Sequence, residues 1–380
     1  MSSSLKEKYI RLLEEICTIE TPSGHVANIN ALVDKLDSFA GENGYQTERF
    51  PFENAGDFLL IKSGESSGKK PVLFMAHMDT VHQVGAFGKE AVTRDGDWMM
   101  GPGVMDCKDG IVTALWVMEC LKNDCERPVY LLLTSDEEAT GRFSGQKGYD
   151  IMTDIARNCV AVLNMEPGRY DEVTVGRKGI LNMRADVTGV AGHAGNAYFD
   201  AASAIREAAH MVLEIEGMSQ RGGVTYNCGI IGGGTAKNVI PDACTMEIDI
   251  RVSNMDEMAQ AGEKMYEVAK HRVDKNTKRE VTVTSKRPPM KVTEDNLKLL
   301  KVWNRCAEKL GLPAFKQLIR GGGSDAAYTV LAGVPTLCSC AAVGFCEHTL
   351  SEKLDLSSFD DRIALLCEVI RNVSEIERKG

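Results

Sequence analysis

The sequence predicts an α/β protein in which a smaller α+β domain is inserted into a larger α/β domain. Up to residue 168, strand-like runs alternate with helical runs, an order typical of βαβ units and a largely parallel sheet. Residues 178–287 follow the order β-α-β-β-α-β, which is the ferredoxin-like pattern. After residue 288 the first pattern resumes. We therefore expect a larger domain made of residues 1–177 and 288–380, interrupted by residues 178–287.

Each expected element has a local signal in the sequence. The run LKEKYIRLLEEICTIE (5–20) places its apolar residues at helical spacing and ends at TPSG (21–24). In the larger domain we further expect strands within 71–81, 127–138, 159–168 and 334–340, and helices at 110–124, 296–311 and 356–377. In the inserted domain we expect strands at 180–190, 223–234, 243–253 and 279–285, and helices at 200–217 and 256–273.

Composition narrows the class of protein. The net charge of −10 disfavours nucleic-acid binding, which requires basic patches. The longest apolar runs are far shorter than the ~20 residues of a membrane helix, so we expect no membrane partner. The N-terminal run MSSSLKEKYIRLLEE lacks the apolar stretch of a secretory signal, and the twelve cysteines are scattered. These features predict a cytoplasmic protein with reduced thiols.

Acidic residues and histidines recur directly after the apolar runs. His77 and Asp79 follow PVLFMA, Glu137 and Glu138 follow VYLLLTSD, and Glu166 follows VAVLNM. Two further residues complete the pattern, namely Asp106 in GPGVMDCKDG and His348 after TLCSCAAVGFCE. Ligands of open α/β sheets bind at the carboxyl ends of the strands, so we expect these side chains to meet at one edge.

Taken singly, each of these residues has an ordinary structural explanation. His77 could be a hydrogen-bonded core histidine, Asp106 a turn former, and Glu166 a solvated loop acid. The acids at 136–138 could stabilise a helix N-terminus. Together, however, converging carboxylates would repel one another and raise each other's pKa values. A divalent metal removes that cost, and carboxylate with imidazole is a suitable ligand set for zinc.

An ordered set of motifs resembles the dizinc exopeptidases and amidohydrolases. This family includes acetylornithine deacetylase, succinyl-diaminopimelate desuccinylase, aminoacylase, peptidase T and glutamate carboxypeptidase. The matching motifs run from residue 77 to residue 352: HMDTV, GPGVMDCKDG, TSDEEATG, NMEPG, GHAG, DIRV, GGGSDAAY and EHTLSE. The motif GGGSDAAY is closest to the glutamate carboxypeptidase branch. The resemblance implies a zinc-exopeptidase-like α/β catalytic domain whose inserted ferredoxin-like domain serves as a lid and dimerisation domain.

The resemblance also implies a metal site and a proton carrier. One Zn²⁺ would be bound by His77, Asp106 and Glu166, and the other by Glu138, Asp106 and His348. Zinc could be replaced by Co²⁺ or Mn²⁺. Glu137 would be the general base, and Asp79 would orient His77. A cis peptide is expected after the shared aspartate, between Asp106 and Cys107. Asp136 receives no role.

The inserted domain and the glycine-rich motif are expected to bind substrate. His193 resembles the histidine that stabilises the oxyanion from a neighbouring subunit, so a homodimer is expected. Arg251 resembles the arginine that binds the free carboxylate of the substrate, although a surface charge is the plainer explanation of this residue alone. Asn238 would add a polar contact. Gly322 and Gly323 would offer backbone amides.

The expected activity is hydrolysis of an amide bond next to a free carboxylate. A metallo-carboxypeptidase or dipeptidase is the first expectation, with a small peptide as substrate. An N-acyl-amino-acid deacylase is the alternative, and a non-catalytic member of the fold is a third. A P-loop is disfavoured because GESSGKK (64–70) has three residues between its glycines and no final Ser or Thr. A serine hydrolase is disfavoured by the lack of G-x-S-x-G.

Overall fold

The computed structural model describes residues 3–64 and 68–376. Residues 65–67 of GESSGKK and residue 377 of the expected last helix therefore lie outside the described residues. By its internal contacts the chain divides into two compact units. The larger unit comprises residues 1–176, 292–319 and 324–380, and the smaller unit comprises 177–291 and 320–323. Arg177 and residues 288–291 and 320–323, which the sequence alone placed in the larger domain, thus lie with the smaller unit.

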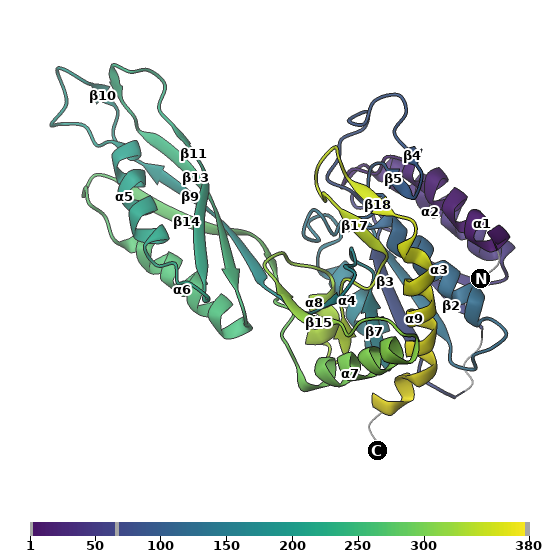
Figure 1. The fold of residues 1–380 in the computed structure, drawn as a ribbon. Coiled ribbons are helices and arrows are strands. Elements are labelled where there is room, and N and C mark those ends of the chain that lie inside the picture. The colour runs from purple at the N-terminus through teal and green to yellow at the C-terminus, as the bar shows by residue number, and fades with distance from the viewer. Residues whose placement is uncertain (1–2, 65–67, 377–380) are drawn as a thin grey trace. The chain divides into compact units, whose positions relative to one another are not determined.

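A six-stranded sheet forms the centre of the larger unit (Figure 1). Its strand order is β1-β2-β6-β3-β7-β16, with bounds Gln46–Phe50, Phe58–Ser63, Val129–Thr134, Val72–His77, Ala161–Asn164 and Thr336–Leu337. The strands β6, β3, β7 and β16 are mutually parallel. At one edge of the sheet, β2 pairs antiparallel with β6, and β1 pairs antiparallel with β2. The largely parallel sheet is as expected. It brings the carboxyl ends of β3, β6 and β7 to the same edge.

Helices cover both faces of this sheet because its strands are apolar on both sides. Along β3, Val72, Phe74 and Ala76 enter one apolar core, whereas Leu73 and Met75 enter another. The first core includes residues of α1 (Ser3–Cys17), α2 (Val26–Glu42), α3 (Lys108–Leu121), α7 (Glu294–Lys309) and α9 (Ser358–Asn372). The second includes residues of α4 (Gly145–Arg157) and α8 (Ala326–Leu331). The 3₁₀ helix η1 (Val373–Ile376) follows α9.

Two smaller ladders complete the larger unit. One has the order β17-β18-β5-β4, with bounds Val343–Phe345, Lys353–Asp355, Trp98–Met100 and Thr93–Asp95. The loop between β17 and β18 carries His348 and Glu352. The other ladder pairs β8 (Glu172–Arg177) with β15 (Lys316–Arg320).

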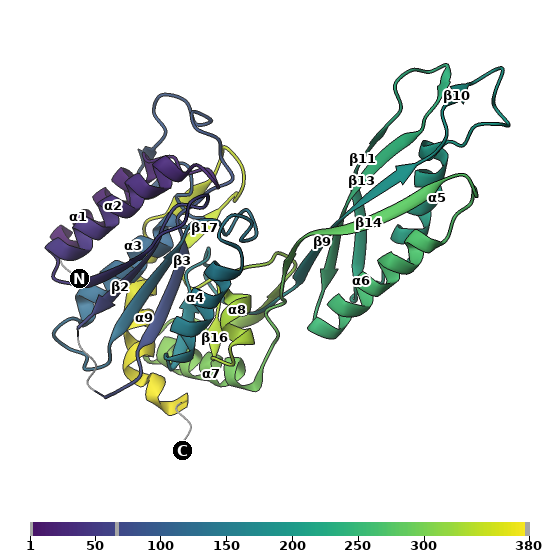
Figure 2. The same ribbon diagram turned by 180° about the vertical axis from the view of Figure 1, so that it is seen from behind.

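The smaller unit is an antiparallel sheet with two helices on one face (Figure 2). In chain order it contains β9 (Gly179–Thr188), α5 (Ala204–Glu216), β11 (Thr225–Gly233), β13 (Ala243–Val252), α6 (Met255–Lys270) and β14 (Lys278–Arg287). Its sheet has the order β11-β13-β9-β14, so β11 is an edge strand. A short ladder pairs β10 (Gly192–His193) with β12 (Val239–Ile240). The order of the main elements is the expected β-α-β-β-α-β.

None of the helices in the described parts of the chain is long and apolar enough to cross a membrane.

Candidate metal centre

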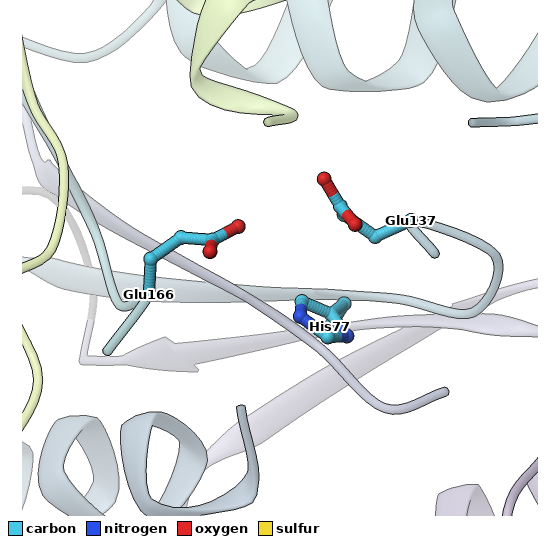
Figure 3. Close-up of side chains that lie close together, drawn as sticks. All are labelled: His77, Glu137 and Glu166. Carbon is cyan, nitrogen blue, oxygen red and sulfur yellow. The ribbon is translucent and has the colours of Figure 1, made fainter. Parts of the chain in front are cut away.

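Four segments of the larger unit deliver acidic and imidazole side chains to one place. His77 ends β3, Glu137 and Glu138 lie in the loop after β6, and Glu166 follows β7. Asp106 lies just before α3. Figure 3 shows His77, Glu137 and Glu166, from three separate segments, gathered around a common space. For His77, Glu137, Glu138 and Glu166, the convergence follows from the parallel arrangement of β3, β6 and β7.

The ligand atoms fall into overlapping groups. One atom each of His77, Asp106 and Glu138 lie within 4.8 Å of one another, and so do those of His77, Glu137 and Glu166. Separations of this size suit donors that share an ion, because Zn–N and Zn–O bonds are roughly 2 Å long. The two groups share His77, so the donors form one continuous cluster.

Asp106 lies between the two histidines. Its Oδ1 is 3.1 Å from Nε2 of His77, and its Oδ2 is 3.3 Å from Nε2 of His348. The same Nε2 of His348 lies 3.2 Å from Oε2 of Glu138. One carboxylate that presents a separate oxygen to each histidine has the geometry of a bridging ligand. The expected cis peptide between Asp106 and Cys107 is confirmed.

Electrostatics show how strongly this centre favours positive charge. Hydrogen bonds to Asp106 and Glu138 raise the pKa of His348 to about 11. Burial acts to raise the pKa of Asp106, but the hydrogen bonds from His348 and His77 outweigh it and hold that pKa well below its usual range. Burial, together with the charge of Asp106, raises the pKa of Glu138 to about 7. Cationic imidazoles on both sides therefore stabilise the carboxylate of Asp106, a task that bound dications would also perform.

Asp79 joins β3 to the loop that carries the two glutamates. Its fully buried carboxylate accepts the backbone N–H groups of Glu137 and Glu138, at 3.0 and 3.1 Å, and the hydroxyl of Ser23 at 2.6 Å. Nδ1 of His77 lies 2.9 Å from the backbone oxygen of Asp79 and 3.4 Å from its carboxylate. The backbone carbonyl of Asp79 is therefore the nearer partner that orients His77. The carboxylate of Asp79 mainly holds the backbone of Glu137 and Glu138 in position.

The predicted substrate residues of the smaller unit form two local groups. His193 and Asn238 lie together at the β10–β12 ladder, where Ala194 N donates to the backbone oxygen of Asn238 at 3.0 Å. Nδ1 of His193 accepts the backbone N–H groups of Gly195 and Asn196. Arg251 lies near the glycine-rich motif, since its Nη1 donates to Gly321 O at 3.3 Å.

Arg251 already has a carboxylate partner. Its Nε and Nη2 donate to the two oxygens of Asp249 at 2.7 and 2.8 Å. Gly322 and Gly323 are the other two residues predicted to contact substrate. The backbone oxygen of Gly323 accepts a hydrogen bond from Nη1 of Arg177 at 3.0 Å. A Cβ added at Gly322 would come no nearer than 3.8 Å to Nη1 of Arg177, so this glycine is not required for space.

Comparison with known proteins decides the family. The profile of Peptidase family M20/M25/M40 matches residues 73–372, which include every predicted metal ligand. The chain belongs to the M20/M25/M40 peptidase family. It is therefore a metal-dependent hydrolase.

Two curated relatives show the range of the family. The chain is 28% identical to carboxypeptidase G2 of Pseudomonas sp. (strain RS-16) over 96% of this chain and 89% of the relative. It is 29% identical to acetylornithine deacetylase of Myxococcus xanthus over 58% of this chain and 61% of that protein. The family thus includes relatives named as a peptidase and as a deacetylase.

Solved structures share the fold. A tripeptidase from Staphylococcus aureus has a TM-score of 0.79 at 20% identity and covers 97% of this chain and 99% of its own. A Bacillus subtilis protein, described as a dinuclear metal binding peptidase of family M20, has a TM-score of 0.70 at 14% identity. It covers 99% of this chain and 100% of its own. In the present chain, two groups of three donor residues are candidates for metal binding.

Several residues that hold the candidate metal centre in place had no predicted role. Asp136 accepts the backbone N–H groups of Phe143 and Ser144 at 2.9 and 2.7 Å, so it fixes the loop after Glu138. Ser324 donates to Oε1 of Glu166 at 3.0 Å. Ser324 is the fourth residue of the motif GGGSDAAY. Its position in that motif is the one feature of the sequence that could have indicated a role at the site.

Glu352 is a further supporting residue that the sequence left unassigned. Its buried carboxylate accepts the backbone N–H groups of Gly103, Met105 and Asp106 at 3.2, 3.0 and 3.2 Å. Its Oε2 also lies 2.9 Å from Nε2 of His82. Glu352 closes the motif EHTLSE, which begins one residue before His348. It therefore links the loop of His348 to the loop of Asp106.

Proposed function

We propose that the chain is a dizinc exopeptidase that removes a C-terminal residue from a small peptide. The observation that supports this most directly is the position of Asp106 between His77 and His348, with Glu138 beside it. His77, Asp106 and Glu166 would hold one Zn²⁺, and Glu138, Asp106 and His348 the other. When bound, the metal ions supply Lewis acidity toward the amide carbonyl and toward water. Co²⁺ and Mn²⁺ are alternatives that the same donors accept.

Glu137 is proposed as the proton carrier. It is buried, its backbone is held by Asp79, and its carboxylate lies in the donor group of His77 and Glu166. It would accept a proton from the attacking water and deliver that proton to the nitrogen of the leaving amine as the C–N bond breaks. The carbonyl carbon gains the water oxygen, and the products are a carboxylate and a free amine.

The smaller unit is proposed to recognise the substrate. Arg251 would bind the free carboxylate with its guanidinium, exchanging part of its present pairing with Asp249. Asn238, Gly322 and Gly323 would add polar contacts. His193 would stabilise the oxyanion in the neighbouring subunit of a homodimer.

Apolar side chains on α5 and β11 support the homodimer. Ile205 and Leu213 of α5 are 41% and 74% exposed, and Ile230 and Ile231 of β11 are 67% and 50% exposed. The two elements pack against each other, and β11 is the free edge of its sheet. Exposed apolar groups beside an unpaired strand are typical of a surface that a partner covers.

N-acyl-amino-acid deacylation is the second candidate activity, favoured by the similarity to acetylornithine deacetylase. Both reactions cleave an amide bond near a free carboxylate. The deciding experiment is a matched screen in which the zinc-loaded enzyme receives dipeptides, tripeptides and N-acetyl amino acids that share the same C-terminal residues. Faster release from peptides supports the exopeptidase, and faster release from acetylated amino acids supports the deacylase. Hydrolysis of neither series, with both metals bound, would refute the proposal.

A cytoplasmic location is also proposed. It is supported by the twelve cysteines, all of which are free thiols in the structure.

A further inference from the structure

A buried chain of hydrogen bonds leads to the carboxylate of Glu166. Asn164, the last residue of β7, is 3% exposed, and Ser324 and Cys338 are fully buried. Nδ2 of Asn164 donates to Oγ of Ser324 at 2.9 Å and to Sγ of Cys338 at 3.3 Å. Oγ of Ser324 in turn donates to Oε1 of Glu166 at 3.0 Å. The chain therefore links the end of a central strand to a proposed metal ligand, and all of it lies in the larger unit.

The strand alone does not account for an asparagine at position 164. β7 is paired on both sides, with β3 and with β16, and its other residues, 161–163, are apolar and buried. An amide in such a place costs free energy unless its polar atoms form hydrogen bonds. Both protons of the Nδ2 group have an acceptor here, in Ser324 and Cys338. The amide is therefore held in one orientation, with its donor side toward Ser324.

The contacts of Ser324 fix the direction of its own proton. A serine hydroxyl has one proton to donate and two lone pairs that accept. Nδ2 of Asn164 and the backbone N–H of Ala326 both donate to Oγ, at 2.9 and 3.3 Å, and the thiol of Cys338 donates toward it at 3.8 Å. The proton of Ser324 therefore points to Glu166, where a hydrogen bond to a carboxylate is stronger than one between neutral groups.

Glu166 belongs to only one of the two proposed ligand sets, the one with His77 and Asp106. We propose that Asn164 is a positioning residue of this set. By donating to Ser324, Asn164 directs the proton of Ser324 to Oε1 of Glu166 and so sets the orientation in which Glu166 meets its metal ion. The inference rests on the proposed dizinc site. Groups that orient a metal ligand in this way typically contribute about 10–100-fold to metal affinity.

Stepwise binding of Co²⁺ tests this role without reference to activity. The full-length protein is freed of metal by a chelator and titrated with Co²⁺, whose visible absorption reports each ion that enters a protein site. The wild type should bind two ions. In Asn164→Asp the new carboxylate accepts the proton of Ser324 in place of Glu166. The affinity for one ion should therefore fall at least roughly tenfold, and the affinity for the other should stay unchanged.

Asn164→Ala separates the direction of the proton from packing. Alanine leaves Ser324 able to donate to Glu166, so the loss of affinity should be smaller than in Asn164→Asp. A packing role predicts the opposite order, because only alanine leaves a cavity, and that order would refute the proposal. Ser324→Ala removes the donor itself and should also weaken one ion alone. This variant decides the matter if Asn164→Asp does not fold.

Thr174→Val is the control for loss of a buried hydrogen bond. Thr174 and Ser339 are buried in the larger unit and share a hydrogen bond of 3.0 Å that lies outside the chain from Asn164 to Glu166. This variant should bind both ions as the wild type does. Equal weakening of both ions in Asn164→Asp and Ser324→Ala, or no weakening of either ion, would overturn the positioning role alone. A wild type that does not bind two ions would refute the dizinc site, and the positioning role with it.

Discussion

The carboxylate of Glu352 accepts the backbone N–H of Asp106 at 3.2 Å, although 246 residues separate them in sequence. With Gly103 and Met105 as further donors, Glu352 is the common acceptor of the loop that presents Asp106. The loop of one proposed ligand, His348, is thereby tied to the loop of another.

Replacement of Glu352 by Gln should weaken metal binding. The amide keeps the shape of the side chain but removes the charge that the three N–H groups and His82 share, so Asp106 should be held less firmly. Residues that orient ligands typically contribute about 10–100-fold to metal affinity, and we expect a loss of that size in chelator competition. Glu48→Gln on exposed β1 is the control. Equal metal affinities of the two variants would contradict this role.

Replacement of Glu137 by Ala should remove turnover but not the metal. Loss of a general base typically lowers kcat by roughly 10²–10⁴-fold. Metal analysis by mass spectrometry should still find two ions per chain. The adjacent variant Glu138→Ala is the matched comparison, since it should lose metal as well as activity. An active Glu137→Ala enzyme, or a Glu138→Ala enzyme with full metal content, would show that the roles are assigned wrongly.

Replacement of Arg251 by Ala should act selectively on substrates with a free carboxylate. Loss of a bidentate charged pair is expected to lower kcat/KM for such substrates by roughly 10–100-fold, while amidated analogues change little. Arg184→Ala is a close control, because Arg184 pairs with Asp186 through Nε and Nη2 as Arg251 pairs with Asp249. Equal losses for free and amidated substrates would argue against a carboxylate clamp.

A charge on the exposed face of α5 should separate the subunits of the proposed homodimer. Leu213→Glu places a carboxylate on a side chain that is 74% exposed in the single chain, so it should fold as a monomer. Light scattering after size exclusion should show the change in mass, and activity should fall because His193 would lose its target. Tyr266→Glu, on exposed α6, is the control. A wild-type monomer with full activity would rule out the dimer.

The sequence could predict where the candidate ligands gather because these residues follow apolar runs. His77, Glu137, Glu138 and Glu166 each stand at or just after a strand of a largely parallel sheet, so one rule about strand ends brings them together. The same pattern included Asp106 and His348, and in the structure Asp106 lies 3.1 Å from His77 and His348 lies 3.2 Å from Glu138.

The supporting contacts could not be read from the sequence in the same way. Asp136 bonds to backbone groups seven and eight residues away, which requires the conformation of the intervening loop. His77 is oriented by a carbonyl oxygen, and every residue carries one, so no residue type marks that role.

The stability of the smaller unit should depend on Glu207 and on pH. The residue is buried, and its carboxylate accepts the backbone N–H groups of Val273 and Asp274 and Nε of Arg279, at 2.9, 3.0 and 2.8 Å. Burial acts to raise the pKa of Glu207, but these backbone and guanidinium donors outweigh it and lower that pKa below its usual value. A carboxyl group whose pKa is lower in the folded state stabilises the fold above the unfolded-state pKa of ~4.3. That contribution is lost as the pH falls through the folded-state pKa.

Glu207→Gln should therefore destabilise the smaller unit at neutral pH by about 2 kcal/mol, because Arg279 loses a charged acceptor. The difference from the wild type should shrink as the pH falls below ~4, where the wild-type carboxyl also becomes protonated. All three tryptophans (Trp98, Trp116 and Trp303) lie in the larger unit, so hydrogen exchange of β9 and β13 is the suitable measurement. Glu263→Gln on the exposed side of α6 is the control. The stability difference between Glu207→Gln and the wild type could instead stay constant down to acid pH. That result would contradict the proposed pH dependence, because the loss of stability would then come from packing and not from charge.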